Sequence, residues 1–293
     1  MRHQRFGPLD VDVPVIGLGT WQMEADDRDS AILSIRRAID LGMTHIDTAE
    51  IYGRGAVEEI VGEALAGHRS EALVASKVHP EHATFAGTLL ACEKSLRRLR
   101  TDRLDLYLLH WRGSLPLEET IRAFEVLKQD GKIRAWGVSN FDVPALAHAI
   151  DIAGEGAIAC NQVIYNLYER DAEHMLQIFC ERHHIAFVGY SPLGSGQFPR
   201  AGSFEDDVLA GIAATHGVTA RAVALAWLCR RPGAFTIPKS SSVAHVEELA
   251  RAGDLVLTDD EVRAIDAAFP LAPPKSNPFS SPTSRGSTWP GEE

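Results

Sequence analysis

Short apolar runs alternate with longer amphipathic segments along most of the chain. Many of these runs are apolar at consecutive positions, which is typical of strands that are buried on both faces of a parallel sheet. The segments between them place apolar residues three and four positions apart and often end at glycine, as amphipathic helices do. The eight predicted strands cover residues 13–19, 44–49, 72–78, 103–110, 133–140, 157–165, 185–192 and 234–240.

Eight strand–helix repeats predict a fold of the α/β class, the (β/α)8 TIM barrel. An open doubly wound sheet fits less well, because it has fewer strands and carries a GxGxxG fingerprint that this chain lacks. Residues 1–14 contain two alternating runs around a Gly-Pro turn, which predicts an N-terminal β-hairpin that could plug the N-terminal mouth of the barrel. We therefore treat residues 1–293 as a single barrel domain.

The chain beyond the eighth strand predicts two further helices, at about 243–252 and 258–268. Thr258 followed by Glu261 forms a capping box at the start of the second of these, which is an extra helix at the C-terminal end. Residues 271–293 are rich in proline and serine and have no period, so we expect a mobile tail there.

Composition narrows the class of protein. The 293 residues are 45% hydrophobic and 24% charged, as in folded soluble proteins, and the net charge of −11 opposes binding to nucleic acid or to anionic membranes. We see no signal peptide and no apolar stretch of membrane-spanning length. The four cysteines form no CxxC pair, which favours a reducing, cytoplasmic location.

Polar titratable residues stand where three neighbouring strands end. Asp47 ends the second predicted strand and Tyr52 lies in its loop, Lys77 lies near the end of the third strand, and His110 ends the fourth. Catalytic groups of (β/α)8 barrels lie at the carboxyl ends of the strands, so we expect these four side chains to converge. A lone tyrosine after a strand is usually a packing residue, and only its combination with the other three makes it a catalytic candidate.

These four residue types suit the reduction of a carbonyl group. A cationic lysine stabilises a phenolate, so we expect Lys77 to move the pKa of Tyr52 down from about 10 toward the working range. Asp47 would favour the charged form of Lys77, and His110 would orient the carbonyl oxygen through a hydrogen bond. Because such a site has no reductant of its own, it needs a redox cofactor.

The chain resembles the aldo-keto reductases, and especially the bacterial members that reduce methylglyoxal and other small or aromatic aldehydes. The resemblance covers nearly all of the chain and rests on motifs that occur together in the family order. They are GLGTW (17–21), HIDTAEIYG (45–53), SKV (76–78), LDLYLLHW (104–111), GKIRAWGVSNF (131–141), NQVIYN (161–166), GYSPLGSG (189–196) and IPKS (237–240).

The resemblance implies a role for each matching residue. Tyr52 would donate the proton, Lys77 and Asp47 would tune it, and His110 would orient the substrate. Trp21 and Trp111 would form apolar walls of the substrate pocket. The residues that would hold the cofactor are Gly19, Thr20, Trp21, Asp47, Ser139, Asn140, Gln162, Tyr190, Ser191, Leu193, Ser195, Lys239, Ser240, His245 and Glu248.

The implied cofactor is NADPH, but we expect only a small preference for NADPH over NADH. The resemblance places the adenosine 2′-phosphate at Lys239 and Ser240. The chain carries His245 and Leu249 where many family members have an arginine and an asparagine. A histidine is only partly charged near neutral pH and lacks the bidentate fork of arginine, which weakens the discrimination. The resemblance also suggests a monomer.

Two other functions fit parts of the pattern. A Schiff-base lyase would use Lys77 as its nucleophile, but it leaves the motifs around Tyr190 and IPKS unexplained. A non-enzymatic, NADP(H)-binding accessory subunit that senses redox state is the third reading. We expect no metal, because the histidines lack zinc-binding spacings such as HExxH.

Overall fold

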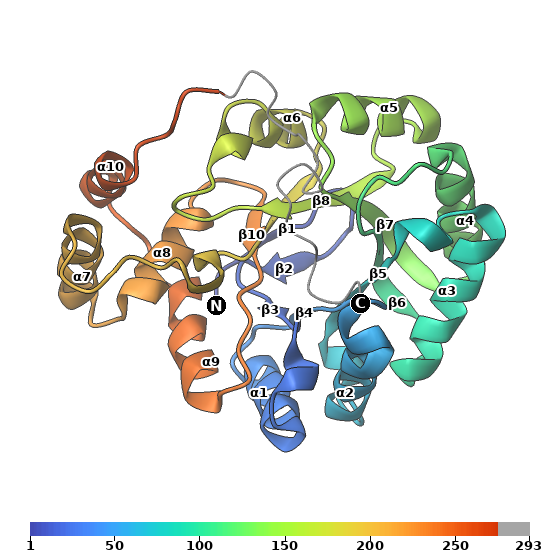
Figure 1. Cartoon of the computed structure of the whole chain (residues 1–293), viewed down its shortest axis with the longest axis horizontal. Coiled ribbons are helices and arrows are strands. Elements are labelled where there is room, and N and C mark those ends of the chain that lie inside the picture. The colour runs from blue at the N-terminus through green and yellow to red at the C-terminus, as the bar shows by residue number, and fades with distance from the viewer. Residues whose placement is uncertain (275–293) are drawn as a thin grey trace.

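A computed structural model describes residues 1–274, so most of the predicted C-terminal tail lies outside the described residues. Eight parallel strands form one sheet that curls around a central axis, with helices outside it (Figure 1). The strands are β3 (Leu18–Gly19), β4 (His45–Asp47), β5 (Leu73–Val78), β6 (Leu104–Leu109), β7 (Ile133–Ser139), β8 (Ile158–Ile164), β9 (Ala186–Tyr190) and β10 (Ala234–Thr236). Each strand lies within the range predicted from the apolar runs.

The sheet closes between the first and last strands of the barrel. Ile16 bridges Thr236 and Gly19 bridges Lys239, both in parallel orientation. The backbone N–H of Gly17 donates to the Thr236 carbonyl at 2.8 Å. The predicted (β/α)8 barrel is therefore confirmed.

A helix follows each of the eight barrel strands, and these helices cover the outside of the barrel. Their bounds are α1 (Arg28–Asp40), α2 (Ala56–Ala64), α3 (Phe85–Arg98), α4 (Leu117–Gln129), α5 (Val143–Ala153), α6 (Leu176–Arg182), α7 (Phe204–His216), α8 (Ala220–Leu228), α9 (Val243–Ala250) and α10 (Asp259–Ala268). α7 and α10 pack against each other at the periphery (Figure 1). The predicted capping box opens α10, with both Thr258 and Glu261 hydrogen bonds present.

Side chains of alternate strand residues supply two separate apolar cores. In β6, Leu106 and Leu108 point into the barrel, whereas Tyr107 and Leu109 belong to the core between the sheet and the helices. Every residue of β6 is buried. This two-sided burial is why the strand is apolar at consecutive positions.

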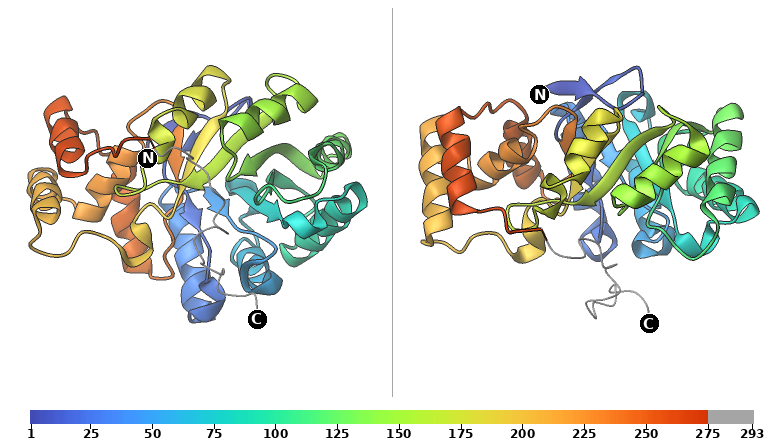
Figure 2. Two further views of the ribbon diagram at one scale, coloured as in Figure 1. Left: turned by 45° about the horizontal axis from the view of Figure 1, so that its top comes forward. Right: turned by 90° about the horizontal axis from the view of Figure 1, so that it is seen from above.

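The N-terminal hairpin closes the bottom of the barrel, as the sequence predicts. β1 (His3–Arg5) pairs antiparallel with β2 (Asp12–Pro14), and Figure 2 shows this hairpin across one end of the barrel. Phe6 is fully buried in the interior core, and its ring centroid lies 4.8 Å from that of Phe235. The amino ends of the strands are thus sealed, and the opposite ends remain for the site.

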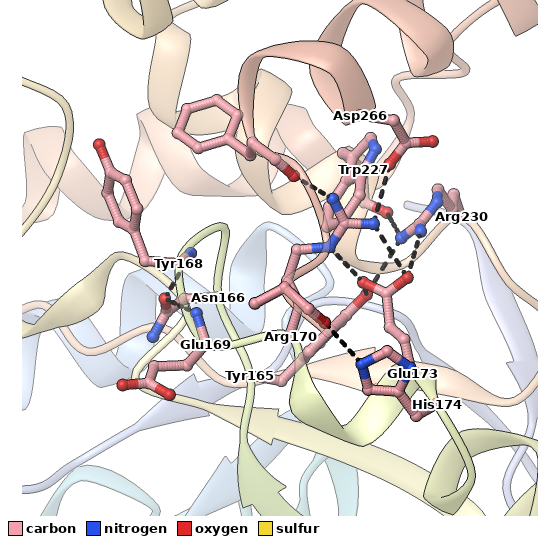
Figure 3. Close-up of polar contacts among 12 residues, drawn as sticks. Tyr165, Asn166, Tyr168, Glu169, Arg170, Glu173, His174, Trp227, Arg230 and Asp266 are labelled. Atoms are coloured by element: carbon pink, nitrogen blue, oxygen red, sulfur yellow. Dashed lines mark hydrogen bonds and ion pairs between the residues drawn. The ribbon is translucent and has the colours of Figure 1, made fainter. Parts of the chain in front are cut away.

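A buried ion-pair network fixes the segment that follows β8 (Figure 3). The carboxylate of Glu173 accepts hydrogen bonds from the Tyr165 hydroxyl at 2.9 Å and from Arg170 Nε at 2.7 Å. It also accepts one from Arg230 Nη2 at 3.1 Å. Arg170 Nη2 reaches Asp266 of α10 at 2.9 Å. The network therefore fastens this loop to the outer helices.

No single helix in residues 1–274 is long and apolar enough to cross a bilayer. α7 and α8 meet the length and composition test only as a pair, and that pair is bent by 94°.

Candidate active site

Four polar side chains meet at the carboxyl ends of β4, β5 and β6. Lys77 Nζ lies 2.6 Å from Asp47 Oδ1 and 3.3 Å from the hydroxyl oxygen of Tyr52. Tyr52 begins the short 3-10 helix Tyr52–Gly55, and its ring centroid lies 5.7 Å from that of His110. The expected convergence of these four residues is present.

Lys77 is a charged group in a fully buried position. Its ammonium donates to Asp47, to the Thr48 carbonyl at 2.9 Å and to the Tyr52 hydroxyl. Burial by itself would lower the pKa of Lys77, but the Asp47 carboxylate and Tyr52 outweigh it, so this pKa lies above its usual value. Three acceptors and a raised pKa keep the amine protonated.

The direction of the Tyr52 pKa shift differs from the sequence prediction. Burial raises the pKa of the Tyr52 phenol, and the opposing effect of Lys77 does not overcome it. The prediction of a lowered pKa is therefore wrong for this structure, because it counted the lysine and omitted the loss of water around the phenol. The phenol stays protonated at neutral pH, which is the form that donates a proton.

His110 is a neutral imidazole at the edge of the same group. Burial, followed by the charges of Lys77 and His79, holds the pKa of His110 well below 6.5. Its Nδ1 is buried and has no hydrogen-bond partner within residues 1–274. A neutral ring can donate one hydrogen bond without bringing a second positive charge next to Lys77.

An aromatic side chain, that of Trp111, lies beside His110. The Trp111 ring is half-buried, and its centroid lies 4.9 Å from those of both His110 and His79. Trp21 follows β3 at the same edge of the barrel and is also half-buried. The His79 and Trp111 rings pack edge to face, with an interplanar angle of 88°.

A second polar group continues around the rim at the ends of β7, β8 and β9. Asn140 Nδ2 donates to the His110 carbonyl at 3.2 Å, and its Oδ1 accepts from the Tyr190 hydroxyl at 3.0 Å. Ser139 Oγ donates to the Gln162 carbonyl at 2.8 Å. These residues, which the resemblance assigns to the cofactor, are therefore held together.

Asp47 connects the two groups. Its Oδ1 accepts from Lys77, and its Oδ2 accepts from Gln162 Nε2 at 2.8 Å. The Thr20 hydroxyl donates to the Asp47 backbone carbonyl at 2.8 Å. One buried carboxylate therefore fixes the lysine on one side and the amide on the other.

Left-handed backbone conformations occur at several loop residues near the rim. The φ angles are 59° at Asn140, 49° at Ser191 and 48° at Ser195, none of which is glycine. Ser195 Oγ donates to Ser191 Oγ at 3.1 Å, and Leu193 packs on the outer core. Such conformations cost about 1–3 kcal/mol each and concentrate at functional sites.

Gly19 shows a close approach of two backbones beside this rim. A Cβ atom at Gly19 would lie 2.8 Å from the carbonyl oxygen of Ile237. A side chain there would separate the strand pair that closes the barrel.

A surface cleft lies where the IPKS segment meets the start of α1. Lys239 forms an ion pair with Asp26, and the Ser241 hydroxyl donates to the same carboxylate at 2.5 Å. The lining residues are Asp26, Asp27, Ser30, Lys239, Ser240, Ser241, Ser242 and His245.

One residue of the predicted cofactor set, Glu248, lies outside this cleft, and Asp26 is among the lining residues that were not predicted. Glu248 does not line the cleft and lies 3.9 Å from Arg221, while Leu249 is buried. Asp26 was missed by the sequence analysis. Its only signal was an acidic pair before a helix, which is also the ordinary pattern of a helix start.

The chain matches known proteins over nearly its whole length. The model of the aldo/keto reductase family matches residues 15–269. Methylglyoxal reductase YeaE of Escherichia coli (strain K12) is 42% identical over 263 residues, which cover 89% of this chain and 93% of that protein. Glyoxal reductase of Bacillus subtilis (strain 168) is 38% identical over 260 residues, which cover 88% and 89%.

A solved structure gives the same result. An aldo/keto reductase from Klebsiella pneumoniae, crystallised with NADP and acetate, has a TM-score of 0.86 and 44% identity, with coverage of 92% of this chain and 95% of that one. Barrel, rim and sequence thus agree, and the chain belongs to the aldo/keto reductase family of NAD(P)H-dependent oxidoreductases.

Proposed function

We propose that this protein reduces small and aromatic aldehydes and ketones to alcohols with NADPH, and that Tyr52 donates the proton. The observation that carries this proposal is the protonated phenol of Tyr52 held 3.3 Å from the buried ammonium of Lys77. Among these substrates, we propose methylglyoxal as the preferred one.

The rim fits a nicotinamide cofactor. Ser139, Asn140 and Gln162 bring hydroxyl and amide groups together next to the Tyr190 ring, which suits a planar ring bearing a carboxamide. Lys239 and the neighbouring serines offer a cation and hydroxyl donors in an open cleft. Relatives from Klebsiella pneumoniae were crystallised with NADP and with NADPH, which supports the choice of cofactor. When bound, the cofactor supplies the hydride for the carbonyl carbon.

The chain's own residues handle the proton and the charge on the carbonyl oxygen. The neutral His110 ring orients the oxygen with an N–H hydrogen bond, and the Tyr52 hydroxyl gives its proton to that oxygen as the alkoxide forms. A phenol is intrinsically more acidic than an alcohol, so proton transfer from Tyr52 to the forming alkoxide is favourable. Lys77, held by Asp47, stabilises the phenolate that remains. General acid catalysis of this kind contributes about 10²–10⁴-fold.

The lyase alternative loses support from the state of Lys77. A Schiff base requires an unprotonated amine with a free lone pair. The ammonium of Lys77 instead donates to three oxygens and has a raised pKa. An accessory role is also disfavoured, because the four groups that turnover needs are assembled.

The choice of substrate rests on the pocket walls and on the relatives. Trp111 offers a flat apolar ring beside His110, and Trp21 follows β3 at the same end of the barrel. The relatives from Escherichia coli and Bacillus subtilis are named for methylglyoxal and glyoxal. A panel of methylglyoxal, glyoxal, phenylglyoxal and benzaldehyde, followed by the loss of NADPH absorbance, ranks the candidates by kcat/KM. A low value for every aldehyde contradicts the substrate class.

The proton donor is tested with Tyr52→Phe. The ring and its packing remain, so NADPH affinity should stay within about twofold while kcat falls by at least 10², the lower range for a general acid. Tyr168→Phe is the matched control, because Tyr168 is exposed and contacts Phe269 instead of the site. An unchanged kcat in Tyr52→Phe rejects the assignment.

A further inference from the structure

The carboxylate of Asp26 lies on the donors that an anionic ligand of this cleft would use. Asp26 pairs with Lys239 and accepts a hydrogen bond from the Ser241 hydroxyl at 2.5 Å. Asp26 and Lys239 are 213 positions apart, so the barrel closure brings them together. These contacts hold the pKa of Asp26 below its usual value, and the group is therefore an anion at neutral pH.

The other charges around the cleft do not compensate for Asp26. Asp27 also lines the cleft, although its carboxylate caps α1 by accepting from the Ser30 backbone N–H at 2.9 Å. Lys239 is the single lysine in the lining of the described cleft, and His245 is the only other basic residue in that lining. Two carboxylates thus face one ammonium where a phosphate would need positive charge.

We propose that Asp26 sets the cofactor preference by competing with the 2′-phosphate of NADP(H) for Lys239 and Ser241. This inference rests on the proposed function, because it assumes that the adenosine end of the cofactor enters this cleft. A 2′-phosphate must displace the Asp26 carboxylate from both donors and then lies next to a like charge, and each effect weakens binding. NAD(H) carries no such phosphate and meets neither effect.

The same carboxylate suits the unphosphorylated ribose. An acidic side chain accepts a hydrogen bond from the ribose 2′-hydroxyl in other dinucleotide sites that take NAD. Asp26 therefore lowers the affinity for NADP(H) and raises the affinity for NAD(H), so the two affinities become more similar. The chain therefore has a built-in residue that makes it tolerant of NADH.

The test measures binding of NADP⁺ and NAD⁺ to the wild-type chain and to Asp26→Asn by titration calorimetry. Asparagine keeps the size of the side chain and removes its charge. The fragments 2′,5′-ADP and 5′-ADP serve as probes that contain only the adenosine end. The control is Asp29→Asn, which removes one exposed negative charge from the same helix start without touching the cleft.

Asp26→Asn should bind NADP⁺ and 2′,5′-ADP about tenfold more tightly, while the affinities for NAD⁺ and 5′-ADP stay equal or fall. Asp29→Asn should shift both cofactors alike and by less than about twofold. An unchanged NADP⁺ to NAD⁺ affinity ratio in Asp26→Asn overturns the inference and leaves the proposed function intact. A wild-type chain that binds neither dinucleotide overturns both.

Discussion

Glu173, in the segment that follows β8, accepts hydrogen bonds from two arginines and a tyrosine (Figure 3). The substitution Glu173→Gln keeps the volume of this side chain and removes its charge. One amide oxygen can still accept from Tyr165 and Arg170 Nε. The new NH2 group then faces Arg170 Nη2 and Arg230 Nη2, which are themselves donors, at positions now 3.0 and 3.1 Å from Oε2.

The expected loss follows from the burial of these charges. The side chains of Glu173, Arg170 and Arg230 are 3%, 7% and 14% exposed. Removing one partner of a buried ion pair costs about 3–5 kcal/mol because the other charge stays behind. Arg230 keeps some access to water, so we expect the lower end, about 3 kcal/mol. In a chain of this size that lowers Tm by about 6 °C.

Urea unfolding followed by tryptophan fluorescence measures this loss. Trp227 is a local reporter, since the guanidinium of Arg230 lies 3.6 Å from its ring centroid. Glu63→Gln is the matched control. The pair of Glu63 and Arg28 has a similar distance of 2.8 Å, but its side chains are 40% and 46% exposed, so its loss should be below about 1 kcal/mol. Equal losses in the two variants would refute the argument from burial.

The loss of stability in Glu173→Gln should also depend on pH. Burial by itself would raise the pKa of Glu173, but Arg170 and Arg230 outweigh it and lower the pKa below 4.5. A carboxylate with a depressed pKa stabilises the fold above its unfolded pKa, and this contribution is lost as the pH falls through the folded value. The difference in the free energy of unfolding between the wild type and Glu173→Gln should therefore be largest at neutral pH and decrease below about pH 4.5.

Two further predictions concern the closed end of the barrel. Burial lowers the pKa of His45 from 6.5 to about 4. Between these two pH values the unfolded chain binds more protons than the folded chain. The free energy of unfolding should therefore fall by up to about 3 kcal/mol as the pH drops from 6.5 to about 4. In urea unfolding measured above and below pH 6.5, His45→Met should reduce this pH dependence of stability. If the pH dependence is unchanged in His45→Met, a group other than His45 causes it. Gly7→Ala should cost more than about 2 kcal/mol, because φ is +54° and the added Cβ would lie 2.2 Å from the Ala159 carbonyl oxygen. Gly67→Ala is the thermal-unfolding control, since its φ is +85° with nothing within 4 Å, and a loss as large as that of Gly7→Ala contradicts the steric argument.

The barrel was predictable because its strands have a simple requirement. A strand covered by helices outside and by side chains inside must be apolar at consecutive positions, and β6 is an example. The role of α7 was not predictable in this way. An amphipathic pattern shows that a helix buries one face, and it does not show that the face of α7 meets α10 as well as α8.

The convergence of the four rim residues was predictable for a topological reason. Parallel strands place their carboxyl ends at one rim, so residues that are distant in sequence meet there. The pKa of Tyr52 depends on how much water the folded loops exclude, which the order of residues does not encode. Asp26 was missed because its partner lies on the opposite side of the closure and nothing near Asp26 in sequence points to it.

The closure between residues 16–19 and 236–239 has a consequence for synthesis on the ribosome. The first barrel strand emerges early, but its partner β10 emerges only after all the other strands. Until then the nascent chain has two unpaired edges that can pair with other chains. The slowest step of maturation, and the one that most needs a chaperone, should therefore be the joining of the first strand to the last.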